Sequence, residues 1–169
     1  LTHAQTQVGA QQPLDLGFKP EHMDVVRNGL VGVVTSGTSA RVFAGAGYTS
    51  AGKTGTAQAV TIGQKDKYDA AKLSEYQRDH ALYMAYAPAD KPQIAVAVVV
   101  ENAGFGAASA APIARRVFDY WLLGQYPSEE DMAATQKGQT ASPIGKPRNK
   151  AEVPLMAPKI LPAGKADKP

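Results

Sequence analysis

The chain has 169 residues, of which 44% are hydrophobic, and this size and composition suit one globular domain with a moderate core. The formal net charge is +3, and because Lys and Arg form no evident stripe, a nucleic-acid partner is not expected. The absence of cysteine excludes disulfides, thiolate metal sites and a cysteine nucleophile, and no apolar run approaches the ~20 residues needed to cross a membrane.

The N-terminal part is expected to hold an irregular arm, a helix and a short strand. Residues 1–19 are polar, and Pro20 suits the first turn of a helix because the N–H that proline lacks would be unpaired there. Apolar residues then recur at helical spacing on one face, at Met23, Val26, Leu30 and Val33. We expect this helix to stop at Gly37 and residues 41–43 to form a short strand.

The middle of the chain is expected to hold three strands and a long polar loop. Residues 48–60 have strand character, whereas residues 61–80 are rich in charge, and a loop of that length is usually functional or mobile. Apolar runs at 81–87 and 93–101 flank the turn 88–92, which predicts a hairpin. Because the second run is apolar on both faces, we expect it to be a central, covered strand.

A second helix is expected near the end of the domain. Ser109 can cap it, Pro112 fits its first turn and Gly124 can end it. The apolar stripe expected to pack on the sheet consists of Ile113, Val117, Trp121 and Leu122. Aromatic side chains expected in the core are Tyr83, Tyr86, Phe118 and Trp121.

This order of elements predicts an α+β fold, an antiparallel sheet with helices packed on its faces. Residues 1–126 would form the domain. Residues 127–169 hold seven of the twelve prolines and scattered charges, so we expect them to be a disordered tail.

Residues 50–58, Ser-Ala-Gly-Lys-Thr-Gly-Thr-Ala-Gln, are the most informative segment and fit three motif patterns. In the first, residues 47–54 match the phosphate-binding pattern G-x-x-x-x-G-K-[ST]. That loop needs Lys53 and Thr54 to begin a helix, whereas the residues that follow favour a strand. A nucleotide-binding protein is therefore kept as an alternative, which ATP binding by residues 47–54 would support.

The second pattern is a Ser-x-x-Lys nucleophile pair, Ser50 with Lys53. Residues three apart share a face on a helix but point to opposite faces of a strand. Because we expect a strand here, a chance overlap of common residue types is the better interpretation.

The third pattern is the Lys-Thr-Gly motif of penicillin-binding proteins and serine β-lactamases. On a strand, the hydroxyls of Thr54 and Thr56 share a face and can bind a substrate carboxylate. Lys53 supplies positive charge, and Gly55 leaves room for a close approach of backbone or substrate. The N–H of Thr56 can serve as one donor of an oxyanion hole. The non-functional alternative is an ordinary polar edge strand.

Residues beyond the motif strengthen the third interpretation. Lys53–Gln58 and four downstream segments, Arg78–Leu82, Ala85–Pro88, Pro92–Ala97 and Glu101–Gly104, resemble class B penicillin-binding proteins of the elongation-specific type, penicillin-binding protein 2. The resemblance extends over about residues 20 to 126, and the spacing of the elements agrees with it.

The resemblance implies a peptidoglycan D,D-transpeptidase of cell-wall and cell-shape biogenesis, in which a serine attacks a stem peptide ending in D-Ala-D-Ala and forms an acyl-enzyme. A β-lactam takes the place of that peptide. Lys53, Thr54, Gly55 and Thr56 would form one wall of the cleft. No metal or organic cofactor is implied. The partners implied are a membrane glycosyltransferase and elongation-complex proteins.

The chain also departs from the family pattern. The helical Ser-x-x-Lys and the Ser-x-Asn of the family lie upstream of the Lys-Thr-Gly strand, and apart from Ser50 neither pattern occurs here. We therefore expect the C-terminal part of a longer, periplasmic, membrane-anchored transpeptidase, inactive without its upstream part. A non-catalytic β-lactam-sensing module of the same fold is a further alternative.

Histidine contributes no metal site in this interpretation. His3 and His22 lie far apart in sequence. For His80, a hydrogen bond that anchors a loop is favoured over an acid–base role, and for Glu101 a capping or salt-bridge role is favoured.

Overall fold

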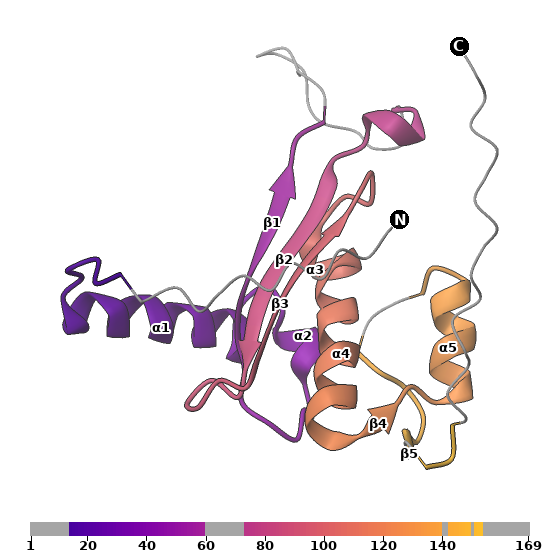
Figure 1. Ribbon diagram of the computed structural model, residues 1–169. Helices are drawn as coiled ribbons and strands as arrows, with labels where there is room; N and C mark the ends of the chain where they lie inside the picture. The colour runs from indigo at the N-terminus through magenta and orange to yellow at the C-terminus, as the bar shows by residue number, and fades with distance from the viewer. Residues whose placement is uncertain (1–13, 60–72, 140–141, 150, 154–169) are drawn as a thin grey trace, which may run out of the picture.

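The computed structural model describes residues 14–59, 73–139, 142–149 and 151–153. Its elements, in chain order, are α1 (Pro20–Thr35), α2 (Ala40–Phe43), β1 (Ala51–Ala57), a 3-10 turn (Glu75–Gln77), β2 (His80–Ala87), β3 (Ile94–Val100), α3 (Gly106–Ser109), α4 (Ala111–Leu123), β4 (Gln125–Tyr126), α5 (Glu129–Gln136) and β5 (Arg148–Asn149) (Figure 1). The predicted α+β fold with an antiparallel sheet is confirmed.

The main sheet has three strands in the order β1-β2-β3, both pairs antiparallel. The hairpin β2–β3 and the strand that carries the motif form as predicted. However, β2 is the central strand and β3 lies at an edge among the described strands, so the prediction of a covered central β3 is wrong. Residues of β3 alternate between half-buried and exposed because only one face of the strand is packed.

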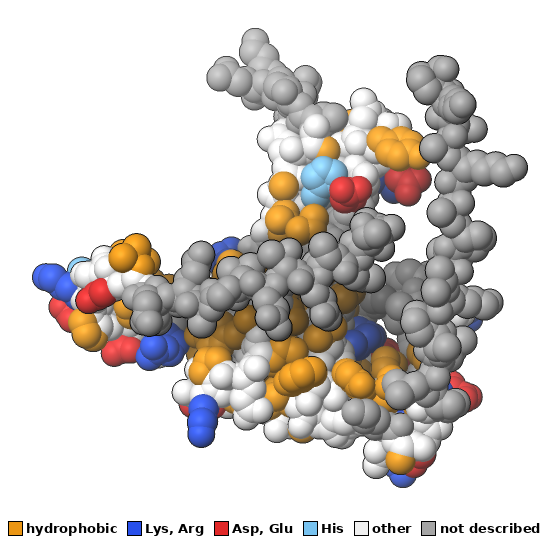
Figure 2. Space-filling view, viewed as in Figure 1, with side chains coloured by type: hydrophobic (Ala, Val, Ile, Leu, Met, Phe, Trp, Pro, Cys, Tyr) orange, Lys and Arg blue, Asp and Glu red, His pale blue; other side chains and the backbone are white. Residues whose placement is uncertain are grey.

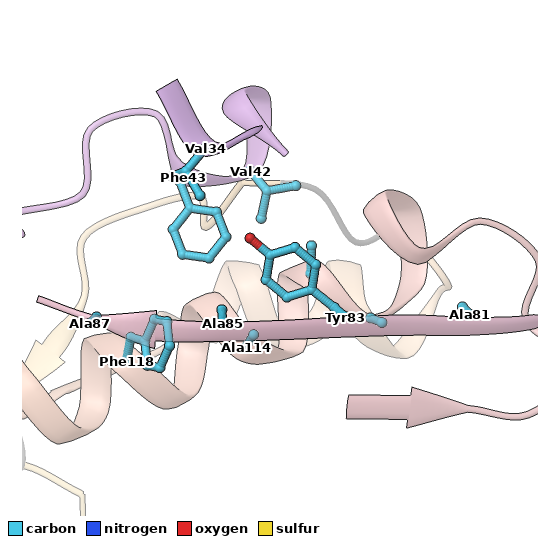
Figure 3. Close-up of a cluster of buried hydrophobic side chains, with 11 residues drawn as sticks. Val34, Val42, Phe43, Ala81, Tyr83, Ala85, Ala87, Ala114 and Phe118 are labelled. Carbon is cyan, nitrogen blue, oxygen red and sulfur yellow. The ribbon is translucent and has the colours of Figure 1, made fainter. Parts of the chain in front are cut away.

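The core lies between the sheet and the helices α2 and α4. Figure 3 shows Tyr83 pointing from β2 toward α2, with Phe43 and Phe118 nearby. The ring centroids of Phe43 and Tyr83 are 6.0 Å apart, and those of Phe43 and Phe118 are 6.3 Å apart. Small residues on the same face of β2, including Ala85, let α4 approach the strand closely. The predicted burial of Tyr83 and Phe118 is confirmed, whereas Tyr86 is only half-buried.

The two long helices begin and end where the sequence predicts. α1 starts at Pro20 and stops just before Gly37, and α4 has proline in its first turn. Gly124 follows α4 with φ 64°, the left-handed conformation that ends helices.

Three local predictions are corrected. Residues 41–43 belong to the short helix α2 rather than to a strand. Ser109 is not a helix cap, because it ends α3 and its hydroxyl donates to the carbonyl of Ala103 at 2.8 Å. The face of α4 that packs on the sheet is built from alanine and Phe118, whereas three residues of the predicted stripe are exposed: Ile113, Val117 and Trp121.

Ordered structure continues past residue 126, within the segment predicted to be disordered. Helix α5 is capped by Ser128, whose hydroxyl accepts the N–H of Asp131 at 2.9 Å. Arg116 of α4 pairs with the buried carboxylate of Asp131 at 2.6 Å. The prediction of disorder is therefore wrong for residues 127–139, and residues 154–169 lie outside the described part of the chain.

Candidate functional site

The segment Lys53–Thr56 lies on β1, at the other edge of the sheet from β3. Its cross-strand partners on β2 run from Met84, opposite Lys53, to Ala81, opposite Thr56. Thr54 is opposite the core residue Tyr83. Since side chains alternate along a strand, both threonines share the sheet face of Tyr83, as predicted, and Lys53 shares the opposite face with Met84.

The threonine face carries a contact that the sequence did not indicate. The hydroxyl oxygens of Thr54 and Thr38 are 3.0 Å apart, a hydrogen bond between β1 and the turn that links α1 to α2. Thr38 and Thr56 are both exposed, and Thr54 is partly buried. Three hydroxyls therefore lie along one side of the site, two from the strand and one from the turn.

Lys53 is exposed on the opposite face of β1. Its ammonium group donates to the carbonyl oxygen of Thr54 at 2.7 Å, so the side chain curls along its own strand. On the same face, an apolar cavity of about 340 Å³ is lined by residues that include Met84 of β2 and Leu30 of α1. Figure 2 shows hydrophobic side chains gathered around the place where α1 meets the sheet.

Two glycines allow close contacts with the backbone at the centre of the motif. A Cβ built on Gly55 would lie 3.3 Å from the Cβ of Leu82, a tight contact. A Cβ built on Gly106, the first residue of α3, would lie 2.2 Å from the carbonyl oxygen of Leu82 and 2.6 Å from that of Gly55. Helix α3 therefore rests directly on the backbone of β1 and β2.

The structure lacks the local geometry that a phosphate-binding loop or a Ser50–Lys53 nucleophile pair requires at residues 47–54. Lys53 and Thr54 lie within a strand, not at the start of the helix that a phosphate-binding loop needs. Ser50 is 3% exposed, and its hydroxyl has no hydrogen-bond partner in the described part of the chain. A buried Ser50 cannot reach a substrate, so it does not form a nucleophile pair with the exposed Lys53.

His80 anchors a turn, as the sequence analysis favoured. Its Nδ1 atom accepts the backbone N–H of Asn102 at 2.9 Å, so the neutral ring carries its proton on Nε2. The side-chain amide of Asn102 donates to the carbonyl of Arg78 at 3.0 Å. Asn102 itself is left-handed, with φ 56°, and leads into α3. His80 thus helps to place the helix that rests on Gly55.

A buried polar cluster joins α4 to the segment before β1. The Arg115 guanidinium pairs with the Asp119 carboxylate at 2.8 Å and donates to the carbonyl of Val42 at 3.1 Å. The Tyr48 hydroxyl donates to Asp119 at 2.9 Å. Burial, and then the Asp119 charge, raise the pKa of Tyr48 well above the ordinary tyrosine value. These groups have structural partners and lie in the core, away from Lys53–Thr56.

The described residues form neither a metal site nor a membrane span. Within the described ranges, no three His, Asp or Glu side chains are grouped closely enough to hold a metal ion. No helix in those ranges combines the length and the apolar character that a membrane span requires.

Most of the chain matches a known protein family. Residues 2–119 match the model of the penicillin-binding protein transpeptidase domain. Peptidoglycan D,D-transpeptidase MrdA of Haemophilus influenzae is 43% identical over 109 residues, which cover 63% of this chain and 17% of that protein. MrdA of Acinetobacter baumannii is 50% identical over 98 residues, 58% of this chain and 14% of that protein. The chain therefore matches only a small part of the length of these relatives.

Two solved structures share the fold. The crystal structure of Pseudomonas aeruginosa PBP2 in complex with WCK 5153 aligns with a TM-score of 0.51 and 39% identity, over 67% of this chain and 24% of that one. PBP2 of Helicobacter pylori, solved as a complex with MreC, aligns with a TM-score of 0.52 over 69% of this chain and 21% of that one. At 24% identity, this second likeness concerns the fold alone.

Proposed function

The chain belongs to the penicillin-binding protein transpeptidase domain family, and from this premise we propose that it supplies one wall of a peptidoglycan D,D-transpeptidase site. The observation that carries the proposal is the placement of Lys53–Thr56 on an edge strand, with accessible hydroxyls on one side and an exposed ammonium group on the other. The threonine face can donate to a substrate carboxylate, and Lys53 on the opposite face of the same strand adds positive charge nearby.

Each residue of the strand has a chemical task in this proposal. The hydroxyls of Thr54 and Thr56 donate to the carboxylate of the terminal D-Ala, or of a β-lactam. Lys53 contributes the positive charge that favours an anionic substrate. The N–H of Thr56 donates to the oxygen that becomes negative in the tetrahedral intermediate.

The nucleophile belongs to an upstream part of the same transpeptidase. A serine oxygen there attacks the carbonyl carbon of the penultimate D-Ala, the peptide bond breaks, and the terminal D-Ala leaves with a proton on its amine. An amine on a neighbouring peptidoglycan strand then attacks the acyl-enzyme, takes the acyl group and frees the serine. Because this chain has no Ser-x-x-Lys apart from Ser50–Lys53 and no Ser-x-Asn, it neither hydrolyses nor acylates alone.

The cellular setting follows from the family in the same way. We place the chain on the periplasmic side of the inner membrane, anchored through an upstream segment. The family resemblance suggests elongation-complex proteins and a membrane glycosyltransferase as partners, and one PBP2 with the same fold, from Helicobacter pylori, was solved in complex with MreC. Residues 1–126 would belong to the transpeptidase domain and 127–169 would follow it, a division supported by the match that ends at residue 119.

The proposal is tested by acylation of the intact parent protein with a fluorescent penicillin. Lys53→Met removes the positive charge, and Thr56→Val removes the hydroxyl that donates to the substrate carboxylate but keeps the backbone N–H. Each should slow acylation by at least about tenfold, since a hydrogen bond to a charged group contributes about 1.5–3 kcal/mol. Lys91→Met, the same change at an exposed position on the β2–β3 turn, is the control and should be acylated at the wild-type rate. Wild-type rates for both site variants would refute the proposed role of the strand.

A further inference from the structure

We propose that Thr38, which lies outside the Lys-Thr-Gly-Thr segment, is a positioning residue of the same site and directs the Thr54 hydroxyl toward the substrate carboxylate. The inference rests on the proposed function and deepens it. It begins from the hydrogen bond of 3.0 Å between the hydroxyl oxygens of the two residues, which are 16 positions apart in sequence.

The direction of this hydrogen bond follows from the proton count of a hydroxyl. Each hydroxyl has one proton to donate and lone pairs with which to accept. When Thr54 donates its proton to a carboxylate, the bond to Thr38 can persist only if Thr38 is the donor. Substrate binding thus selects the order Thr38 to Thr54 to carboxylate. Hydrogen bonds in such a chain polarise and strengthen one another.

The turn that carries Thr38 is fixed to the same strand pair that carries Thr54. The next residue, Ser39, is fully buried, and its hydroxyl lies 3.0 Å from the hydroxyl of Tyr83. Tyr83 is the cross-strand partner of Thr54 in the sheet. Thr38 and Thr54 are therefore both anchored to Tyr83, Thr38 through the next residue, Ser39, and Thr54 through strand pairing. These buried contacts set the distance between the two hydroxyls.

The start of the turn is equally constrained. The N–H of Gly37 donates to the carbonyl of Gly32 at 2.8 Å, and a Cβ at Gly37 would lie 2.7 Å from the Cα of Val33. The chain can turn this sharply because Gly37 has no side chain. Thr38 itself is exposed, so its hydroxyl is accessible beside the strand and its loss leaves no buried cavity.

The experiment uses the intact parent protein and three variants. Thr38→Val keeps the shape and removes the hydroxyl, Thr38→Ser restores the hydroxyl, and Thr35→Val is the control. Thr35 is also exposed and lies in the last turn of α1, but its hydroxyl donates to the carbonyl of Val31 in the same helix rather than to the strand. The second-order acylation constant is measured with benzylpenicillin, which carries a carboxylate, and with its methyl ester, which does not.

For Thr38→Val we expect acylation by benzylpenicillin to fall about tenfold, the effect of weakening one hydrogen bond to a charged group. The loss should be smaller for the ester. Thr38→Ser should recover to within about twofold of wild type, and Thr35→Val should match it. All variants should melt at the wild-type temperature, since the substituted side chains are exposed.

Three results would overturn the inference: wild-type acylation of Thr38→Val, an equal loss with penicillin and ester, or no recovery in Thr38→Ser. An equal loss with both compounds would mean that Thr38 serves only the shape of the turn. Failure of the wild-type protein to react with benzylpenicillin would instead refute the proposed function, so the two failures are distinguishable.

Discussion

Gly106 sits so close to the backbone of β1 and β2 that its lack of a side chain fixes where the site strand lies. The space is closed by backbone oxygens of Gly55 and Leu82, which cannot rotate away as a flexible side chain would. Any larger residue has to move α3 or the strand. The position of the Thr56 N–H, and with it the proposed oxyanion donor, therefore depends on a glycine 50 residues downstream.

Gly106→Ala in the intact protein should lower the free energy of unfolding by about 1–3 kcal/mol, as overpacking does in close-packed regions. It should also slow penicillin acylation by at least about tenfold, because displacement of β1 misplaces the donors. Chemical denaturation and labelling kinetics measure the two effects. Gly29→Ala, in α1 with open space around it, is the control and should lose neither. A Gly106→Ala protein with wild-type kinetics would show that α3 does not position the strand.

The buried hydroxyl of Tyr48 makes the stability of the fold depend on pH. Its pKa is raised in the folded protein by burial and by Asp119, so the folded state holds the proton at a pH where the unfolded chain releases it. The resulting stability is present below about pH 10, the ordinary tyrosine pKa, and is lost as the pH rises above that value. Denaturant titrations from pH 8 to 11 should show a shallower alkaline loss for Tyr48→Phe than for wild type. Parallel curves would contradict the shifted pKa.

At the scale of elements, α4 and α5 are joined by a charge pair rather than by apolar packing. Asp131 is 2% exposed and receives two donors from Arg116, at 2.6 and 2.8 Å. Loss of one partner leaves the other charge without compensation, which is costly when the pair is buried. We therefore expect the position of α5 against α4 to depend strongly on this pair.

Asp131→Ala should release α5 while the sheet stays intact. Hydrogen exchange of the backbone amides of residues 129–136 in the intact protein should rise to the rate of an unstructured peptide. Exchange of the amides in β2 should be unchanged. Glu130→Gln, an exposed neighbour in the same helix, should exchange like wild type. Persistent protection of α5 in Asp131→Ala would mean that other contacts hold it.

The elements also show what sequence reasoning can reach. The β2–β3 hairpin was predictable because its apolar runs flank a proline-containing turn, and α1 because proline and glycine mark its ends. The buried face of α4 was not, because Ile113, Val117 and Trp121 share the helical spacing of the alanines that pack on β2. Only the tertiary context, a close approach of small residues, decides between the two faces.

In the site, the sequence predicts the strand that carries the motif and the alternation of its side chains between the two faces, because both depend on neighbouring residues in the sequence. The roles of Thr38 and Gly106 could not be predicted, because each residue contacts β1 through tertiary structure and not through its neighbours in sequence. A hydroxyl beside a turn carries no sign of the partner it meets 16 residues later. The sequence did contain one usable signal, the glycine-rich run at 104–106, where close backbone approach is common.

At the scale of the whole molecule, large apolar side chains remain exposed on separate surfaces. Met84 and Val99 on the outer face of the sheet are 61% and 62% exposed, and Trp121 on α4 is 61% exposed. Exposed apolar surfaces of this kind mark sites that another protein surface covers. They support the proposal that this chain is one part of a larger transpeptidase domain.

The central claim is that this chain provides a site wall without a nucleophile, and labelling with a fluorescent penicillin tests it most directly. The chain is labelled alone, and then after co-expression with the upstream remainder of its parent protein. Our account predicts no labelling of the chain alone and stoichiometric labelling of the upstream piece in the complex, at a rate that Lys53→Met lowers. Covalent labelling of this chain itself, or no labelling of a folded complex, would contradict the account.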